Sequence, residues 1–139
     1  MTQEEKQLLI QDLCTRSPYG LICSIYRIDD WNVGWRDEKL SGYFYNGTSY
    51  EFYFGKTPIS IDNDISKIKP YLRPMSSMTE EEKEEYLNID NRSYSCPMDY
   101  AHIPATERID WLNAHHFDYR GLIKKGLALE ASKDMYLIK

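Results

Sequence analysis

Residues 39–56 have the sequence KLSGYFYNGTSYEFYFGK, which predicts a β-hairpin around Asn46-Gly47. The register decides which aromatic side chains face the core, because a slip of one residue moves every side chain to the opposite face. A two-residue loop would leave both faces mixed, with Leu40, Phe44, Glu51 and Tyr53 opposite Tyr43, Tyr45, Tyr50 and Phe52. A three-residue loop, Tyr45-Asn46-Gly47, gives a cleaner core face of Leu40, Gly42, Phe44, Tyr50, Phe52 and Phe54. We therefore predict the three-residue loop, with Gly47 in a left-handed conformation.

In this register some of the hairpin's tyrosines face outward, and tyrosine is unusually frequent in the chain, at 12 of 139 residues. Tyrosine and tryptophan are enriched at binding surfaces, because they offer a large contact area for little lost side-chain freedom. Two tryptophans flank a turn expected at residues 32–34 and would extend the same surface. We therefore predict a partner-binding surface made of Tyr43, Tyr45, Tyr53, Trp31 and Trp35. The alternative is that a helix covers this face.

Helices and further strands are expected on both sides of the hairpin. A capping box of Thr2 and Glu5 predicts a helix over residues 3–15, with Leu8, Leu9 and Leu13 on its apolar side. Residues 21–28 include three β-branched isoleucines and predict a strand that Asp29 and Asp30 end. Residues 57–61 predict a short edge strand, where Pro58 is tolerated.

The rest of the chain has helical signals that prolines interrupt. Asp62-Asn63-Asp64 caps an expected helical turn that ends before Pro70. A second capping box, Thr79 with Glu82, predicts a surface helix over residues 80–88 that buries only Tyr86 and Leu87. Residues 90–103 are expected to form a loop. The remaining expectations are helices at 107–115 and 119–125, the latter capped by Asp118 and closed by Gly126, and weak strands at 127–130 and 135–138.

Together these elements predict a single domain, residues 1–139, of the α+β class. Its centre would be a small twisted antiparallel sheet or partly open barrel over residues 21–61. An N-terminal helix and a C-terminal helical segment would flank it. A chain of 139 residues has the length of one ordinary domain.

Composition excludes several functional classes. The net charge of -5 disfavours nucleic-acid binding by phosphate neutralisation. We expect no membrane association and a cytoplasmic location, because the chain has no apolar run of the length a membrane span needs and starts without a signal peptide. The three cysteines, Cys14, Cys23 and Cys96, are odd in number and lack C-x-x-C spacing, so we expect reduced thiols.

Few residues suggest chemistry. His115, His116 and Asp118 are weak candidates for metal ligands, with His102 as a possible fourth, although neighbouring histidines on a helix diverge by about 100°. The other interpretation is that a histidine packs on Trp111 or caps the helix end. Cys96 with His102 would be a nucleophile and base, but Cys96 is not placed at a helix start that would stabilise a thiolate. No common catalytic fingerprint occurs, so we expect neither an enzyme nor a cofactor.

Two blocks of sequence resemble those of an uncharacterised family of small proteins from gut Bacteroidetes and their phages or mobile elements. The blocks are KPYLRPMSSMTEEEK at residues 69–83 and DWLNAHHFDYRGLI at residues 110–123. The turn Pro18-Tyr19-Gly20 is similar to that family as well. The resemblance implies the order of the elements and a genomic setting, and it assigns no catalytic residue.

The leading hypothesis is therefore a non-enzymatic interaction protein, of phage or mobile-element origin, that binds a partner protein through its aromatic sheet face. A metal-dependent or thiol enzyme is the first alternative. Single-stranded nucleic-acid binding by aromatic stacking is the second, and the negative net charge opposes it.

Overall fold

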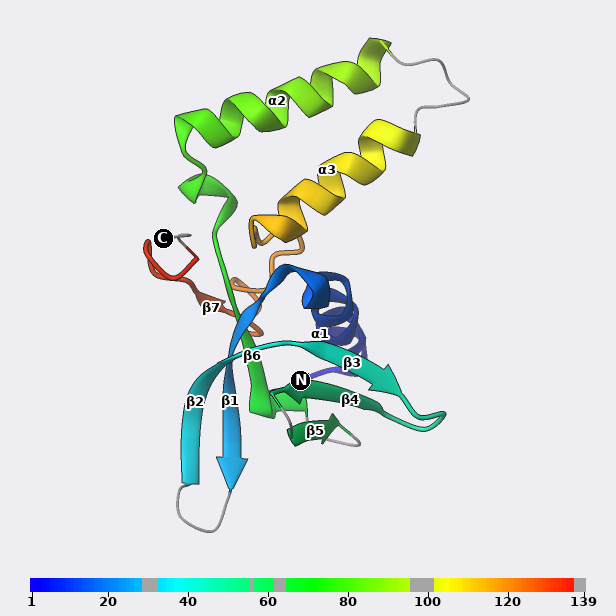
Figure 1. Ribbon diagram of the computed structural model, residues 1–139, viewed down its shortest axis with the longest axis vertical. Coiled ribbons are helices and arrows are strands. Elements are labelled where there is room, and N and C mark those ends of the chain that lie inside the picture. The colour runs from blue at the N-terminus through cyan, green and yellow to red at the C-terminus, as the bar shows by residue number, and fades with distance from the viewer. Residues whose placement is uncertain (29–32, 56, 62–64, 96–101, 137–139) are drawn as a thin grey trace.

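The computed structural model describes residues 1–28, 33–55, 57–61, 65–95 and 102–136, and within these ranges it has an α+β fold (Figure 1). A four-stranded sheet has the order β2-β1-β6-β7, and a three-stranded antiparallel sheet has the order β3-β4-β5. The first sheet consists of β1 (Ile22–Ile28), β2 (Val33–Lys39), β6 (Ile68–Leu72) and β7 (Leu129–Glu130). The second consists of β3 (Gly42–Tyr45), β4 (Tyr50–Phe54) and β5 (Thr57–Ile61). The helices are α1 (Gln3–Arg16), α2 (Glu80–Ser95) and α3 (His102–Ala114), with 3-10 turns at Ser17–Tyr19, Ile65–Lys67 and Met75–Ser77.

The N-terminal helix forms as expected. The Thr2 hydroxyl accepts a hydrogen bond from the Glu5 amide at 3.1 Å, and the Glu5 carboxylate accepts one from the Thr2 amide at 3.2 Å. These two bonds satisfy amides that have no partner within the helix. Leu9 and Leu13 are fully buried in the core, so the predicted apolar stripe is confirmed.

The predicted register of the hairpin is wrong. Tyr45 pairs with Tyr50 and Tyr43 with Phe52, and the tip closes through a hydrogen bond from the Asn46 amide to the Ser49 carbonyl. Gly47 has the expected positive φ, of 98°. The Asn46 side-chain oxygen accepts hydrogen bonds from the amides of Thr48 and Ser49. These bonds favour a turn over residues 46–49 instead of the predicted loop at 45–47. The faces are therefore those of the rejected partition, with Tyr43, Tyr45, Tyr50 and Phe52 together and with Phe44 and Tyr53 opposite.

Two strands of the four-stranded sheet were not expected. β2 is an edge strand with polar residues, and its first residues occupy the turn expected at 32–34. The expected helical turn is present as the 3-10 turn Ile65–Lys67, and the unexpected strand β6 begins directly after it. β6 accommodates Pro70 because β7 pairs with β6 only at Tyr71 and Leu72, so that Pro70 has one neighbouring strand. The β6–β7 pair is parallel, so the sheet is mixed rather than antiparallel. The expected edge strand β5 is confirmed, whereas Asp29, Asp30 and residues 62–64 lie outside the described residues.

One short segment joins the two sheets. The Leu40 amide donates a hydrogen bond to the Leu21 carbonyl at 2.7 Å, next to the first sheet. The adjacent Ser41 amide donates to the Tyr53 carbonyl at 2.8 Å, in the second sheet. Leu40 is buried in the core, whereas Ser41 is exposed.

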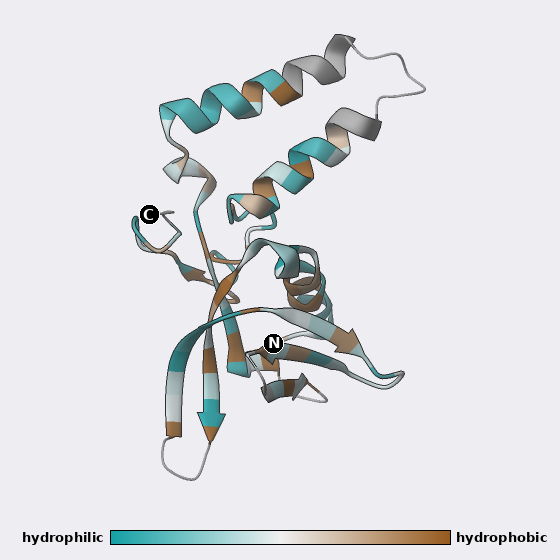
Figure 2. Ribbon diagram, viewed as in Figure 1, coloured by the Kyte–Doolittle hydropathy of each residue, from teal (hydrophilic) through white to brown (hydrophobic). Residues whose placement is uncertain are grey.

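The helices α2 and α3 lie side by side and project from the sheets (Figure 1). The Thr79–Glu82 capping box is confirmed, but α2 is longer than expected and α3 begins earlier, so the loop expected at 90–103 is wrong where these helices extend into it. Most of the N-terminal half of α2 is hydrophilic, as Figure 2 shows, and Leu87 is exposed rather than buried. Tyr86 packs on Trp111 instead, with ring centroids 5.6 Å apart.

The C-terminal segment returns to the first sheet. The Asp118 carboxylate accepts hydrogen bonds from the amides of Leu122 and Ile123, but residues 122–126 form turns, so the helix expected at 119–125 is wrong. A strand was expected at 135–138, yet Tyr136 lies in a turn, and residues 137–139 are outside the described residues. The Tyr136 hydroxyl accepts a hydrogen bond from the Ile22 amide at 3.0 Å and donates one to the Tyr71 carbonyl at 2.7 Å. It thereby bridges β1 and β6.

Among the described residues, no helix combines the length and the apolar character that crossing a membrane requires.

Candidate functional site

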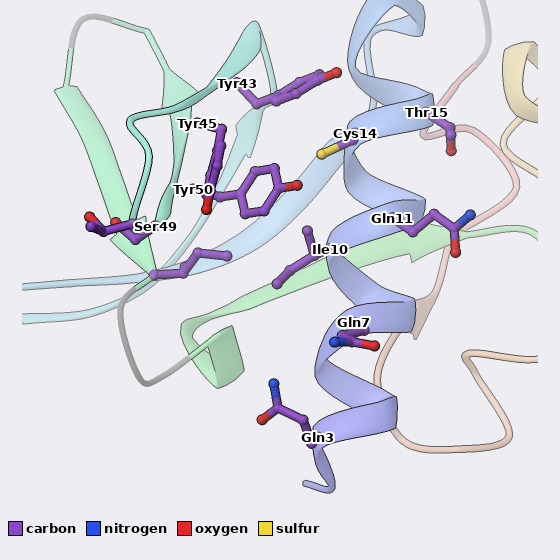
Figure 3. Close-up of a pocket in the computed structure, with 12 residues that line it drawn as sticks. Gln3, Gln7, Ile10, Gln11, Cys14, Thr15, Tyr43, Tyr45, Ser49 and Tyr50 are labelled. Carbon is purple, nitrogen blue, oxygen red and sulfur yellow. The ribbon is translucent and has the colours of Figure 1, made fainter.

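An open groove of about 580 Å³ lies between α1 and the face of the three-stranded sheet (Figure 3). One wall comes from the exposed side of α1, which the capping box and the buried leucines orient. The other wall comes from the hairpin and β5. The residues that line the groove are Gln3, Gln7, Ile10, Gln11, Cys14, Thr15, Tyr43, Tyr45, Thr48, Ser49, Tyr50 and Ile61.

The helical wall has a regular pattern. Gln3, Gln7 and Gln11 are four residues apart and therefore follow one face of α1. All three are exposed. Ile10 and Cys14 are half-buried and point from the helix toward the tyrosine rings, as Figure 3 shows. Amides therefore line the helical rim of the groove, and apolar atoms line its interior.

The sheet wall is aromatic. The rings of Tyr45 and Tyr50 have centroids 4.8 Å apart, and those of Tyr43 and Tyr50 are 6.4 Å apart. Tyr43 is 46% exposed and Tyr45 is 51% exposed. The Tyr45 hydroxyl donates to the Gly47 carbonyl at 3.1 Å, whereas those of Tyr43 and Tyr50 have no hydrogen-bond partner among the described residues. The wall therefore offers aromatic faces and two phenol groups that are free to bond.

Among the described residues that line the groove, none carries a carboxylate, amine, guanidinium or imidazole group. This is unusual in a chain in which 28% of residues are charged. Burial raises the pKa of the Cys14 thiol to about 11, so Cys14 is a neutral thiol at physiological pH. The groove is thus electrically neutral, with amide, hydroxyl and aromatic groups as its chemistry.

The predicted binding residues that the structure describes do not form one surface. Tyr43 and Tyr45 line the groove. Tyr53 lies on the opposite face of the sheet, where its hydroxyl donates to the Glu51 carboxylate at 3.2 Å. Trp35 lies on β2, where its ring meets that of Tyr26 edge to face at 5.6 Å. Trp31 lies outside the described residues.

The sequence interpretation missed the helical wall altogether. A signal for it was present, because glutamine recurs at positions 3, 7 and 11, which is the spacing of one helix face. By itself this spacing indicates only a polar side of an amphipathic helix. Local spacing does not show that the glutamine side of α1 faces a sheet with tyrosines, because this contact joins residues that are distant in the chain.

The candidate metal ligands have structural contacts instead. The His115 ring stacks on Trp111 at 4.1 Å, and its Nδ1 lies 2.8 Å from the Trp111 carbonyl oxygen. Asp118 accepts hydrogen bonds from the amides of Leu122 and Ile123. Within the described residues, no three His, Cys, Asp or Glu side chains are grouped so that they could hold a metal ion. The interpretation that a histidine packs on Trp111 is therefore confirmed for His115.

His116 is buried in an unusual conformation. Its φ is 64°, a left-handed value that is uncommon for residues other than glycine, and its ring stacks on Tyr136 with centroids 3.7 Å apart. Burial, with the positive charge of Arg16 nearby, lowers its pKa to about 4. His116 is therefore neutral at physiological pH and belongs to the packing that holds Tyr136.

The thiol candidates give no catalytic pair in the described residues. Cys96 lies outside them, and His102 is the first residue of α3. Cys23 is fully buried, and burial raises the pKa of its thiol well above the usual range. Cys14 and Cys23 are both free cysteines, as expected.

Comparison of this chain with protein-family models, with curated proteins and with solved structures finds no match. The functional interpretation therefore depends on the chemistry of the groove itself. Neither of the two sequence blocks that carry the family resemblance, residues 69–83 and 110–123, contributes a residue to the groove.

Proposed function

We propose that this chain is a non-enzymatic interaction protein that binds a partner protein in the groove between α1 and the β3–β4 hairpin. The observation that carries the proposal is the convergence of Tyr43, Tyr45 and Tyr50 on one concave surface opposite α1. Concave surfaces lined by aromatic residues and a few polar groups are the usual form of a binding site.

Burial of the exposed tyrosine rings against a partner would supply free energy of binding. A tyrosine that is fully buried removes 150–250 Å² from water, so the exposed halves of Tyr43 and Tyr45 would contribute roughly 2–3 kcal/mol each on burial, before the costs of association. In the free protein this area is in contact with water. Covering both rings would therefore favour association.

Binding fits the groove better than catalysis does. General acid–base chemistry requires a titratable group with a pKa near the working pH, and nucleophilic chemistry requires an activated nucleophile. No described residue of the groove has a charged side chain, and its thiol, Cys14, has a raised pKa. Hydrogen bonding and aromatic contact are the functions its residues support.

Affinity capture with matched variants tests the proposal. Tyr43→Ala/Tyr45→Ala removes the aromatic surface of β3 from the groove. Phe44→Ala is the control, because Phe44 is 56% exposed on the same strand but lies on the opposite face. We expect the double variant to lose a partner that the wild type and Phe44→Ala both retain, and circular dichroism should show that all three proteins are folded at the temperature of the assay. Equal capture by all three proteins would contradict the proposal.

We also propose a cytoplasmic location and an origin in a phage or mobile element. The free thiols of Cys14 and Cys23 support the first, because reduced cysteines are typical of reducing compartments. The two family-like blocks at residues 69–83 and 110–123 support the second. Cell fractionation would test the location, and recovery of the chain in an oxidising compartment would contradict it.

A further inference from the structure

We propose, independently of the groove, that residues 132–136 form a strap that leaves the sheet as a unit when His116 takes up a proton, while the rest of the fold stays intact. The strap follows β7, where the ribbon in Figure 1 is red. Three features of the molecule support the proposal: the attachment of the strap, the position of the His116 ring and the charges around that ring.

The strap is attached to the fold mainly through one side chain. Ala131, just before it, donates its amide to the Leu72 carbonyl at 2.8 Å. Beyond Ala131, the one backbone hydrogen bond among the described residues is local, from the Met135 amide to the Ser132 carbonyl at 3.2 Å. Ser132 and the two residues after it are exposed. Release of the Tyr136 side chain would therefore free the whole strap.

Tyr136 binds where the pairing of two strands ends. The register of β1 and β6 ends with Cys23 opposite Pro70, so Ile22 and Tyr71 are the next residues along the two strands. The Tyr136 hydroxyl accepts a hydrogen bond from the Ile22 amide at 3.0 Å and donates one to the Tyr71 carbonyl at 2.7 Å. These bonds join the strands across the hydroxyl. The strap can therefore leave without breaking a bond of the β1–β6 ladder itself.

The backbone of His116 is fixed on both sides. Its amide donates to the Asn113 carbonyl at 3.1 Å, and its carbonyl accepts from the Arg73 amide at 2.7 Å. Its ring stacks on that of Tyr136 with centroids 3.7 Å apart. Because His116 is held by these bonds and Tyr136 is held by its side chain alone, a change at the His116 ring acts on the strap.

The closed strap leaves no acceptor for a second proton on the His116 ring. Nδ1 is buried and has no hydrogen-bond partner among the described residues. A neutral imidazole can tolerate this, because one of its ring nitrogens carries no proton. An imidazolium has an N–H on both nitrogens, and a buried donor without an acceptor is costly. The protonated ring therefore favours an open strap, which lets water reach Nδ1.

The charges that act on the His116 ring also oppose its protonation. Arg16 from α1, Arg73 after β6 and the neighbouring His115 all act in this direction, together with burial. The carboxylates of the surrounding elements already have partners: Asp12 with Arg16 and Arg120, Glu82 with Arg73, and Asp118 with the amides of Leu122 and Ile123. On the strap itself, Lys133 and Asp134 are exposed to water. The closed strap therefore gives a positive His116 no compensating charge.

Proton uptake should shift the strap equilibrium by a measurable factor. The pKa of His116 is about 4 with the strap closed, and hydration of the ring in the open strap should restore its usual value of 6.5. The open strap thus binds the proton more tightly. The ratio of open to closed strap should rise about 20-fold between pH 7 and pH 5, and should approach about 300-fold in stronger acid.

NMR saturation-transfer measurements on the nitrogen-15-labelled protein, between pH 7 and pH 4.5, test the proposal. We expect the amides of residues 133–136 to exchange with a state that has random-coil chemical shifts, and the population of this state should rise about 20-fold from pH 7 to pH 5. The amides of Leu13 and Phe52, in the core, should show no such exchange. Absence of the open state at pH 4.5 would overturn the proposal. Joint loss of the Leu13 and Phe52 signals would also overturn it, because the strap would then not open as a unit.

Three variants separate His116 from other acid-sensitive groups. His116→Asn tolerates the left-handed backbone and cannot titrate, so its open population should be the same at pH 7 and pH 5. Asp134→Asn is the matched control on the strap and should keep the wild-type pH dependence. Tyr136→Phe keeps the stacked ring but loses both hydroxyl bonds, so its strap should be open roughly 10-fold more often at each pH. A wild-type pH dependence in His116→Asn, or its loss in Asp134→Asn, would show that another group drives the opening.

Discussion

The side-chain oxygen of Asn46 accepts a hydrogen bond from the backbone amide of Ser49 at 2.9 Å. The same oxygen accepts bonds from the Thr48 amide at 3.0 Å and the Thr48 hydroxyl at 2.8 Å. One side chain therefore organises the tip of the hairpin. Because the tip sets the register, Asn46 decides that Tyr43, Tyr45 and Tyr50 share the face that looks toward α1.

Replacing Asn46 should disturb both stability and the groove. Asn46→Ala removes all three bonds, and since the tip is exposed we expect a loss of about 1–2 kcal/mol in the free energy of unfolding. Asn46→Asp retains the acceptor and should lose much less. Denaturant unfolding measures the difference, and equal stability of the two variants would show that the bonds do not hold the turn.

The Arg73–Glu82 ion pair should make stability depend on pH in acid. Two hydrogen bonds of 2.7 Å and 2.6 Å join the guanidinium to the carboxylate, and together with the Thr79 amide they lower the pKa of Glu82 to about 2. A depressed carboxyl pKa gives stability that is present above the unfolded value, about 4.5, and is lost as the pH falls toward 2. We expect about 1–2 kcal/mol to be lost in this window, after allowing for solvent screening.

Glu82→Gln provides the comparison. This variant keeps the size of the side chain but cannot titrate, so its stability should be lower at neutral pH and should fall less between pH 4.5 and 2. Thermal unfolding across that range measures both slopes. Identical slopes would mean that other carboxylates account for the acid sensitivity.

His116 should also make stability depend on pH, in a window that lies above that of Glu82. Its folded pKa, about 4, lies below the usual histidine value of 6.5, so the unfolded chain binds the proton first as the pH falls. Stability should therefore decrease from about pH 6.5 to pH 4, by roughly 2–3 kcal/mol. His116→Asn tolerates the left-handed backbone and removes the titration. The variant should start less stable, because it loses the contact with Tyr136, and should lack this component of the slope.

We expect the Tyr136 hydroxyl to make a large contribution to the free energy of unfolding for a single polar group. Tyr136→Phe leaves the ring in place but removes the bridge between the Ile22 amide and the Tyr71 carbonyl. We expect a loss of about 1–3 kcal/mol, because partly buried backbone groups would lose their partner. Hydrogen exchange at Ile22 should accelerate in the variant. Unchanged exchange there would show that the hydroxyl is not needed to protect the strand.

Features that depend on neighbours in the chain could be predicted from the sequence, whereas features that depend on distant contacts could not. Both capping boxes, the helix at residues 3–16 and the strand at 22–28 depend on neighbours in the chain, and all could be predicted. The strand at 33–39 was missed because an edge strand needs little apolar character. The hairpin register was missed because partitioning apolar faces ignores the hydrogen bonds of Asn46. Of the groove, sequence patterns identified Tyr43 and Tyr45 but not the helix opposite them.

The joint at Leu40 and Ser41 has a consequence for how the molecule comes apart. These consecutive residues bond to Leu21 and to Tyr53, so one peptide unit separates the hydrogen bonds that anchor the chain to the two sheets. Neither sheet can open at this point without pulling on the other. The strand that presents Tyr43 and Tyr45 is therefore held at its base by the more deeply buried sheet, and strain applied to the groove is carried into the centre of the protein rather than dissipated in a loose hairpin.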